Sequence, residues 1–196
     1  MLSVVIPTYN SERSLVPVLA ALVPGVTAGL VGDVVLVDGG STDDTAAIAD
    51  AAGCLFLAPS GDPGIRLRQA AGHLRGNWLM FLSPRSLLAE GWAREVAHFC
   101  ETAERRGQAE AVAATFRIAL DGYGIGPRIG EAVAAARLLL LGLPRPEQGL
   151  VLSRRLYERL GGHPSGMKAD QRLMRRIGRR RIHPLRAHVL LPPPAG

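Results

Sequence analysis

Cysteine and histidine are scarce in this 196-residue sequence, which has two of the former and five of the latter. Cys54 and Cys100 are far apart and form neither a disulfide framework nor a zinc-ligand pattern. We expect both to be buried as small apolar residues. The histidines are isolated from one another, so we expect them to face solvent or to make structural hydrogen bonds.

Long hydrophobic runs are also absent. The longest late run, 132–143, is shorter than a membrane span and contains Arg137. Residues 1–3 include no basic residue, and Pro7 interrupts the apolar run that follows, so we expect no signal peptide. The expected location is therefore the cytoplasm.

Acidic residues are outnumbered, because 17 Asp and Glu oppose 23 Lys and Arg, for a net charge of +6. The excess suits an anionic partner such as a diphosphate or a lipid headgroup, although a solvated basic face explains it too. The densest run, 172–181, mixes arginines with apolar residues at helical spacing and predicts an amphipathic helix. This helix and 137–143 leave peripheral membrane contact open, although core packing explains both more simply. Aromatic residues make up only 5% and no recognition motif occurs, so we expect no nucleic-acid partner.

The sequence does contain a regular alternation of short apolar strands with helices, and 47% of its residues are hydrophobic. Such alternation predicts a packed, parallel sheet built from βαβ units. The expected strands cover 2–6, 33–37, 54–57, 78–82, 111–120 and 149–152. The first helix is expected to start at Ser11 or Ser14, and the others to cover 41–52, 65–74, 91–106, 131–141 and 157–160, with a glycine-rich loop at 122–130.

Two of these strands end in polar residues. The first runs into Pro7-Thr8-Tyr9-Asn10, and the second into the segment 38–45, which reads Asp-Gly-Gly-Ser-Thr-Asp-Asp-Thr. The carboxyl ends of neighbouring parallel strands meet at one edge of the sheet, where open α/β sheets bind nucleotides. Residues 41–44 also form a capping box for the next helix. The sequence therefore predicts a crevice for a nucleotide or a nucleotide sugar.

In this order, the segments resemble the family 2 glycosyltransferases, most strongly at 4–10 and 37–43. The subgroup known as arsenosugar-biosynthesis-type glycosyltransferases is more similar still. It has Asp-Gly-Gly-Ser after its second strand and a Pro-x-Gly-Asp-Gln-Gly segment, which 144–149 nearly reproduces, and 150–162 also matches. The resemblance implies an α/β, GT-A (Rossmann-like) three-layer sandwich with a mostly parallel central sheet. It further implies a single domain, 1–196, with a nucleotide-binding half (1–87) and an acceptor half (88–196).

By this resemblance, the donor is a nucleotide-diphosphate sugar bound over the first two strand ends. Pro7, Thr8 and Asn10 would shape the pocket for the base. Asp38, followed by Gly39, would accept hydrogen bonds from the base or the ribose. The alternative for Asp38 is a purely turn-forming role before the two glycines.

Two arginines open the helix that follows the loop 59–64, where this family often has a basic residue near the diphosphate. A guanidinium group fits phosphate oxygens bidentately, so Arg66 and Arg68 are candidates to bind the diphosphate. Simple surface exposure is the alternative for each of them.

Family members place an Asp-x-Asp-type motif at the end of the fourth strand, where its carboxylates hold Mg²⁺ or Mn²⁺. Here those positions read Ser83-Pro84-Arg85. A hard divalent cation prefers anionic oxygen ligands, so we expect this degenerate motif to hold no metal. Either Arg85 neutralises the diphosphate in place of the metal, or the chain has lost catalysis and keeps only the scaffold.

Inverting sugar transfer needs a carboxylate that takes the proton of the acceptor hydroxyl. The family supplies it from a Glu-Asp pair before the late Arg-rich stretch, where this sequence has only Asp170. Asp170 is the first candidate base, and its alternative is a favourable charge at a helix N-terminus. Glu147 is the second candidate, and Ala70 stands near the position of a family asparagine. We therefore expect a glycosyltransferase with an unknown acceptor or, alternatively, an inactive nucleotide-sugar-binding or scaffold protein.

Overall fold

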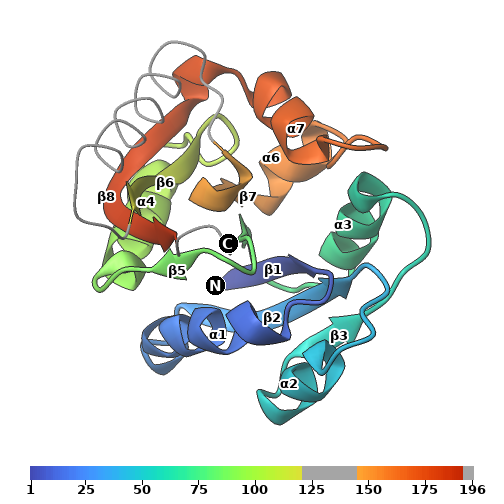
Figure 1. Ribbon diagram of the computed structural model, residues 1–196. Coiled ribbons are helices and arrows are strands. Elements are labelled where there is room, and N and C mark those ends of the chain that lie inside the picture. Colours follow the sequence, from blue (N-terminus) through green and yellow to red (C-terminus); the bar gives the residue numbers. More distant parts are fainter. Residues whose placement is uncertain (121–144, 192–196) are drawn as a thin grey trace.

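The computed structural model describes residues 1–120 and 145–191 (Figure 1). The expected glycine-rich loop at 122–130 and helix at 131–141 lie outside the described residues. The strands are β1 (Leu2–Thr8), β2 (Val31–Asp38), β3 (Leu55–Leu57), β4 (Trp78–Phe81), β5 (Leu87–Leu88), β6 (Ala113–Leu120), β7 (Leu150–Ser153) and β8 (Ile182–Leu191). Within the described ranges they form one sheet in the order β3-β2-β1-β4-β7-β6-β8-β5.

The first half of the sheet is parallel, as expected. β1 pairs in parallel with β2 and β4, and β2 pairs in parallel with β3. The run Leu2–Ile6 is buried on both faces, which explains why it is continuously apolar rather than alternating. This arrangement brings the carboxyl ends of β1 and β2 to one edge.

The second half adds antiparallel pairings and curls the sheet (Figure 1). β7 lies antiparallel between β4 and β6, β6 and β8 are parallel, and β5 closes the edge antiparallel to β8. Every antiparallel pairing involves β7 or β5. The other pairings, β1 with β2 and β4, β2 with β3, and β6 with β8, are parallel, so the sheet is mostly parallel.

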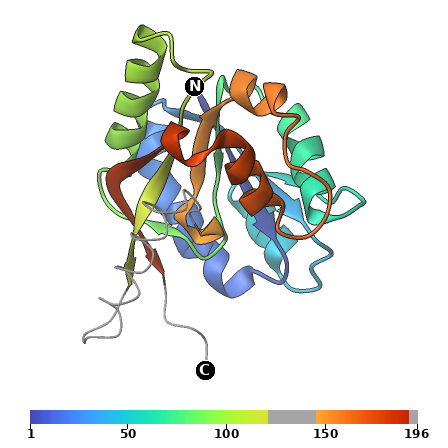
Figure 2. The ribbon, with the colours of Figure 1, turned by 90° about the horizontal axis from the view of Figure 1, so that it is seen from above.

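Helices cover both faces of the sheet (Figures 1 and 2). One face packs against α1 (Glu12–Thr27), α2 (Thr45–Ala51) and α4 (Trp92–Arg105). The other packs against α3 (Pro63–Gly72), α6 (Arg154–Arg159) and α7 (Ala169–Ile177). The expected three-layer sandwich is confirmed.

Two helices can be compared with their expected ranges. The amphipathic helix in the Arg-rich run is confirmed as α7, which buries Leu173, Met174 and Ile177, although it ends before the 3₁₀ turn η2 (Arg179–Arg181). The first helix begins at Glu12, one residue after Ser11. Among the described residues, no helix has both the length and the apolar character needed to cross a lipid bilayer.

Both cysteines are free thiols. Cys100 is buried, and this burial raises its pKa to about 12, so the thiol stays protonated and inert. Cys54 is only half-buried, which is less than we expected for it, and its pKa is raised by the same cause.

Candidate functional site

The carboxyl ends of β1 and β2 are joined by hydrogen bonds. The Thr8 hydroxyl donates to Asp38 Oδ1 at 3.0 Å, and the Gly39 amide donates to the Thr8 carbonyl at 2.8 Å. The loops that follow are also linked, because the Asn10 amide donates to Ser41 Oγ at 2.8 Å and the Asn10 side chain accepts from the Thr42 amide at 2.9 Å. The predicted crevice edge is therefore a single, preorganised unit.

The Asp38 carboxylate is only 4% exposed and organises this edge. Its Oδ1 accepts hydrogen bonds from the hydroxyls of Thr8 and Ser41, at 3.0 and 2.5 Å. Its Oδ2 accepts from the amides of Gly40 and Ser41, both at 2.7 Å. Burial alone would raise the pKa of Asp38, but these hydrogen bonds outweigh it and lower the pKa, so the group is ionised at neutral pH.

The expected capping box at 41–44 is wrong, because its polar groups have other partners. Ser41 bonds Asp38, and helix α2 begins only at Thr45, with Asp44 at its N-cap and no capping bond from that side chain. Asp43 instead accepts from the Glu12 amide at 3.0 Å and from the Thr45 hydroxyl at 2.6 Å. The loop thus ties α2 to the start of α1.

Arg66 reaches this edge from α3. The helix is capped by Asp62, whose side chain accepts from the amides of Gly64 and Ile65 at 2.9 and 3.1 Å. A Cβ atom built on Gly39 would lie 3.3 Å from Nη2 of Arg66. The structure therefore brings Arg66 together with Thr8, Asp38 and Gly39, whereas Pro7 is half-buried in β1 and Asn10 is exposed in the next loop.

Arg68 has a different neighbourhood. Its Nη1 donates to the His163 carbonyl at 3.1 Å, so the guanidinium holds the loop after α6. Residues two apart on a helix point in different directions, so Arg66 and Arg68 have different neighbours. The assignment of Arg68 to the diphosphate stays a prediction.

The end of β4 offers few ligands for a metal. Ser83 and Pro84 are half-buried, Arg85 is exposed, and the Arg85 amide donates to Ser83 Oγ at 3.3 Å. Across residues 1–120 and 145–191 no three His, Cys, Asp or Glu side chains are grouped so that they could hold a metal ion. The guanidinium groups of Arg66 and Arg85 have no hydrogen-bond or ion-pair partner in the same ranges, so both are available to an anion.

Glu147 lies in the 3₁₀ turn η1 (Pro146–Gln148), directly before β7. Ser86 Oγ donates to its carbonyl at 2.7 Å, which joins this turn to the loop after β4. The buried Gln148 fixes the turn by donating to the Phe116 carbonyl at 2.9 Å and accepting from the Arg145 amide at 2.8 Å. The half-buried Glu147 side chain is therefore held near the end of β4 by its backbone.

Asp170 lies in the first turn of α7 and pairs with a histidine that sequence analysis did not connect to it. His163 Nε2 lies 3.1 Å from Asp170 Oδ1, and His163 Nδ1 lies 2.9 Å from Tyr157 Oη. His163 is 0% exposed, whereas the Asp170 side chain is 32% exposed. A histidine directly after Gly161-Gly162 was the available signal, but only the fold shows that it faces Asp170.

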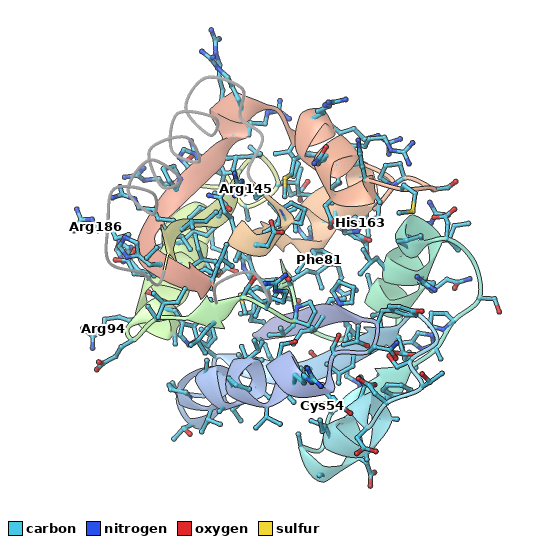
Figure 3. The ribbon with its side chains drawn as sticks, in the orientation of Figure 1. Cys54, Phe81, Arg94, Arg145, His163 and Arg186 are labelled. Atoms are coloured by element: carbon cyan, nitrogen blue, oxygen red, sulfur yellow. The ribbon has the colours of Figure 1, made fainter. Side chains whose placement is uncertain are left out.

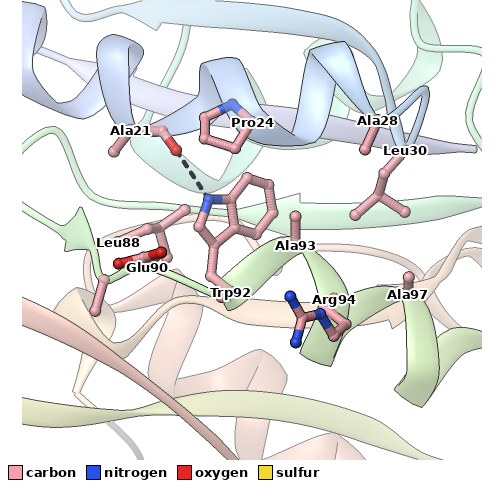
Figure 4. Close-up of a pocket in the computed structure, with 12 residues that line it drawn as sticks. Ala21, Pro24, Ala28, Leu30, Leu88, Glu90, Trp92, Ala93, Arg94 and Ala97 are labelled. Carbon is pink, nitrogen blue, oxygen red and sulfur yellow. Dashed lines mark hydrogen bonds between the residues drawn. The ribbon is translucent and has the colours of Figure 1, made fainter.

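Trp92 lines a separate cavity of about 670 Å³ between α1 and α4 (Figure 4). These two helices cover the face of the sheet opposite to that covered by α3. The Trp92 indole N–H donates to the Ala21 carbonyl at 2.8 Å. Trp92 is 2% exposed and packs in the core, away from the crevice edge.

Residues 3–102 match the profile of one protein family, glycosyl transferase family 2. Among curated protein sequences, none is significantly similar to the chain. The match to the family covers β1 to α4 and so includes the crevice edge.

Solved structures share the fold. For S. aureus TarS 1–349 in complex with UDP-GlcNAc, the TM-score is 0.71 at 19% identity, over all of this chain and 59% of that one. For glucosyl-3-phosphoglycerate synthase from Mycobacterium tuberculosis in complex with Mn²⁺, UDP and glucosyl-3-phosphoglycerate, the TM-score is 0.62 at 22% identity, over 98% of this chain and 70% of that one. This chain therefore spans little more than half the length of TarS 1–349.

Proposed function

The chain belongs to glycosyl transferase family 2, and from that premise we propose that it transfers a sugar from a nucleoside diphosphate to an acceptor hydroxyl. The observation that carries the proposal is the convergence of Asp38, Gly39 and Arg66 at the carboxyl ends of β1 and β2. Two proteins of the same fold were solved with UDP or a UDP-sugar, which supports a uridine or related nucleotide as donor. The narrower assignment to the arsenosugar-biosynthesis-type subgroup rests on the segments 38–41 and 144–149.

In this proposal the nucleoside lies over the loops after β1 and β2, against Pro7, Thr8 and Asn10. The Asp38 carboxylate already accepts four hydrogen bonds, which is about its capacity. A base N–H or ribose hydroxyl would therefore replace the Ser41 hydroxyl on Oδ1, while the two amide bonds on Oδ2 keep the carboxylate in place.

The diphosphate is proposed to lie between Arg66 and Arg85. Both guanidinium groups are free of protein partners among the described residues, and their positive charge can stabilise the leaving diphosphate. A divalent cation does not fit Ser83-Pro84-Arg85, since one hydroxyl beside a fixed positive charge replaces the anionic oxygens that such an ion prefers. We therefore propose a metal-independent reaction, and Arg68 is a further candidate for the diphosphate.

The reaction is proposed to be inverting. The acceptor oxygen forms a bond to the anomeric carbon, and the bond from that carbon to the diphosphate oxygen breaks with its electron pair. The acceptor proton passes to the carboxylate of Asp170, or alternatively to that of Glu147. The products are the glycosylated acceptor and the nucleoside diphosphate.

A second candidate is a non-catalytic protein that binds nucleotide sugars or acts as a scaffold. The favouring observation is that Ser83-Pro84-Arg85 departs from the expected metal motif while Asp38 is fully engaged in its own loop. A binding protein would bind the nucleotide sugar without transferring the sugar. In a scaffold protein, the residues at the ends of β1 and β2 would only stabilise the fold.

The test is calorimetric titration of the purified protein with UDP, GDP and their sugar conjugates, each with and without Mn²⁺. Metal-free binding that the Arg66→Ala, Arg85→Ala double variant loses would support the donor site. Binding that requires Mn²⁺ would contradict the role of Arg85, and no binding would contradict the donor site altogether. Release of UDP from a bound UDP-sugar then separates an enzyme from a binding protein.

We also propose that the protein is cytoplasmic and that it binds peripherally to anionic membranes. The contact would be made by the basic face of α7 and η2. This face carries the exposed residues Arg172, Arg175, Arg176, Arg180 and Arg181, and the neighbouring Met167 is 75% exposed. Each basic residue at an anionic surface contributes about 1 kcal/mol. Sedimentation with phosphatidylglycerol vesicles should exceed that with phosphatidylcholine alone, and Arg175→Glu with Arg180→Glu should abolish the difference. Equal sedimentation with both would contradict the contact.

A further inference from the structure

His163 is a fully buried imidazole whose two ring nitrogens both have partners. Nδ1 lies 2.9 Å from Tyr157 Oη, and Nε2 lies 3.1 Å from Asp170 Oδ1. The ring also packs edge-on against Phe81, with centroids 4.5 Å apart and an interplanar angle of 75°. Both residues are labelled in Figure 3. Three contacts thus fix the position and rotation of the ring.

The hydrogen-bond network assigns the proton on this ring. A carboxylate oxygen can only accept, so Nε2–H donates to Asp170 Oδ1 and Nδ1 of the neutral imidazole accepts from the Tyr157 hydroxyl, whose oxygen also accepts from the His163 backbone amide at 3.3 Å. Burial raises the pKa of Tyr157 to about 12, so the phenol keeps its hydrogen at neutral pH. With Nδ1 accepting, the neutral imidazole carries its proton on Nε2 and donates it to Asp170.

The backbone around His163 is held as firmly as its ring. Arg68 donates to the His163 carbonyl at 3.1 Å. Pro164, the next residue, lies very close to Gly64 in α3. A Cβ atom added to Gly64 would be 2.0 Å from the Pro164 carbonyl oxygen. At the start of α3, a hydrogen bond from the Gly166 amide helps to lower the pKa of Asp62. The loop 163–166 is therefore braced against α3, the helix that also carries Arg66.

Asp170 differs from His163 in being accessible. Its side chain is 32% exposed, and its second oxygen, Oδ2, has no hydrogen-bond partner among the described residues. The bond from His163 thus occupies one carboxylate oxygen and leaves the other without a partner among the described residues. This is the arrangement that a base aimed at an external hydroxyl needs.

We propose that His163 is a positioning residue, which orients Asp170 so that Oδ2 takes the proton of the acceptor hydroxyl. The inference rests on the proposed function, in which Asp170 is the base. In the step, the acceptor O–H bond breaks and an O–H bond forms at Oδ2, while the proton on His163 Nε2 stays in place. His163 touches neither substrate, and Tyr157 supports it by fixing its tautomer.

A packing role alone would make the same contacts with Phe81, so the variants must separate packing from hydrogen bonding. His163→Phe keeps an aromatic ring in the cavity but removes the donor, whereas the amide N–H of His163→Gln can replace Nε2–H. We expect His163→Phe to lower kcat about 10–100-fold, because a hydrogen bond to the charged carboxylate is lost, with the donor KM nearly unchanged. His163→Gln should recover part of this loss, and Tyr157→Phe should lower kcat less than His163→Phe.

The pair can also be observed without turnover. In ¹H–¹⁵N spectra of histidine-labelled protein, His163 is assigned by the signal that His163→Gln lacks. We expect a slowly exchanging Nε2–H signal that moves when Asp170→Asn removes the charge of its acceptor. A proton on Nδ1, or a signal unchanged in Asp170→Asn, would overturn the pairing.

The kinetic outcomes are equally decisive. Wild-type kcat and an unchanged pH profile in folded His163→Phe would overturn the inference. Equal losses in His163→Phe and His163→Gln, together with lower melting temperatures, would assign His163 to packing and also overturn it. A wild-type protein that transfers no sugar would overturn the proposed function and the base role with it, while the Nε2–H signal would still report the pair.

Discussion

A Cβ atom on Gly39 would lie 3.3 Å from Nη2 of Arg66, so this glycine leaves the space in which the guanidinium rests. We expect Gly39→Val to displace Arg66 and to weaken UDP binding about tenfold, because a hydrogen bond to a charged group contributes about 1.5–3 kcal/mol. Calorimetric titration measures the change. Gly72→Val, where nothing lies within 4 Å of the added Cβ, is the control and should bind UDP normally.

The two arginines of α3 should differ in their effect on donor binding. Arg66→Ala is expected to raise the Kd for UDP about 10–100-fold through loss of a charge-assisted contact with phosphate. Arg68→Ala removes the hydrogen bond to the His163 carbonyl and should instead lower the melting temperature. Titration and thermal unfolding of both variants separate the roles. If Arg68→Ala raised the Kd for UDP more than Arg66→Ala does, Arg68 and not Arg66 would be the main ligand of the diphosphate.

The crevice edge could be predicted because its signals are local. Apolar strands that end in polar residues place Thr8 and Asp38 at one edge wherever the strands are parallel neighbours, and the structure has that pairing. The capping box failed because the Ser41 hydroxyl donates to Asp38, the last residue of β2, instead of capping the helix that follows. His163 was missed because its partner lies seven residues away across a loop that only the contacts with α3 fold back. The two-residue β5 carries no pattern of its own.

Asp38 should make the free energy of unfolding depend on pH in the acidic range. Because its pKa is lowered in the folded state, it stabilises the protein above its ordinary pKa and this contribution is lost as pH falls through the folded value. At neutral pH, Asp38→Asn should destabilise the protein by about 1–3 kcal/mol, since an amide N–H2 cannot accept from all four donors.

Urea unfolding from pH 7 to pH 2 tests this dependence. The difference between wild type and Asp38→Asn should shrink as pH falls below about 4. Asp50→Asn, on the exposed face of α2, is the matched control and should follow wild type throughout. A difference that is constant with pH would show that the ionised carboxylate is not the cause.

Gly25 should be intolerant of a methyl group. A Cβ atom there would lie 2.6 Å from Cη2 of Trp92 and 3.0 Å from Cγ2 of Val31, at a buried position of α1. Overpacking costs about 1–3 kcal/mol and outweighs the gain of up to about 1 kcal/mol in helix propensity. Gly25→Ala should therefore lower the free energy of unfolding, whereas Gly72→Ala, with open space around it, should not. Equal stabilities of the two variants would contradict the packing of α1 on Trp92.

The base is tested by comparing the two candidate carboxylates. Asp170 has a partly exposed side chain with one oxygen held by His163, whereas Glu147 is held through its backbone carbonyl, and its side chain has no hydrogen-bond partner among the described residues. We expect Asp170→Asn to lower kcat about 10²–10⁴-fold, the usual contribution of a general base, with UDP binding unchanged because the donor edge is intact. Glu147→Gln should retain most of the activity. Single-turnover assays with saturating donor measure both, and a loss confined to Glu147→Gln would make Glu147 the base and leave Asp170 as a charge at the start of α7.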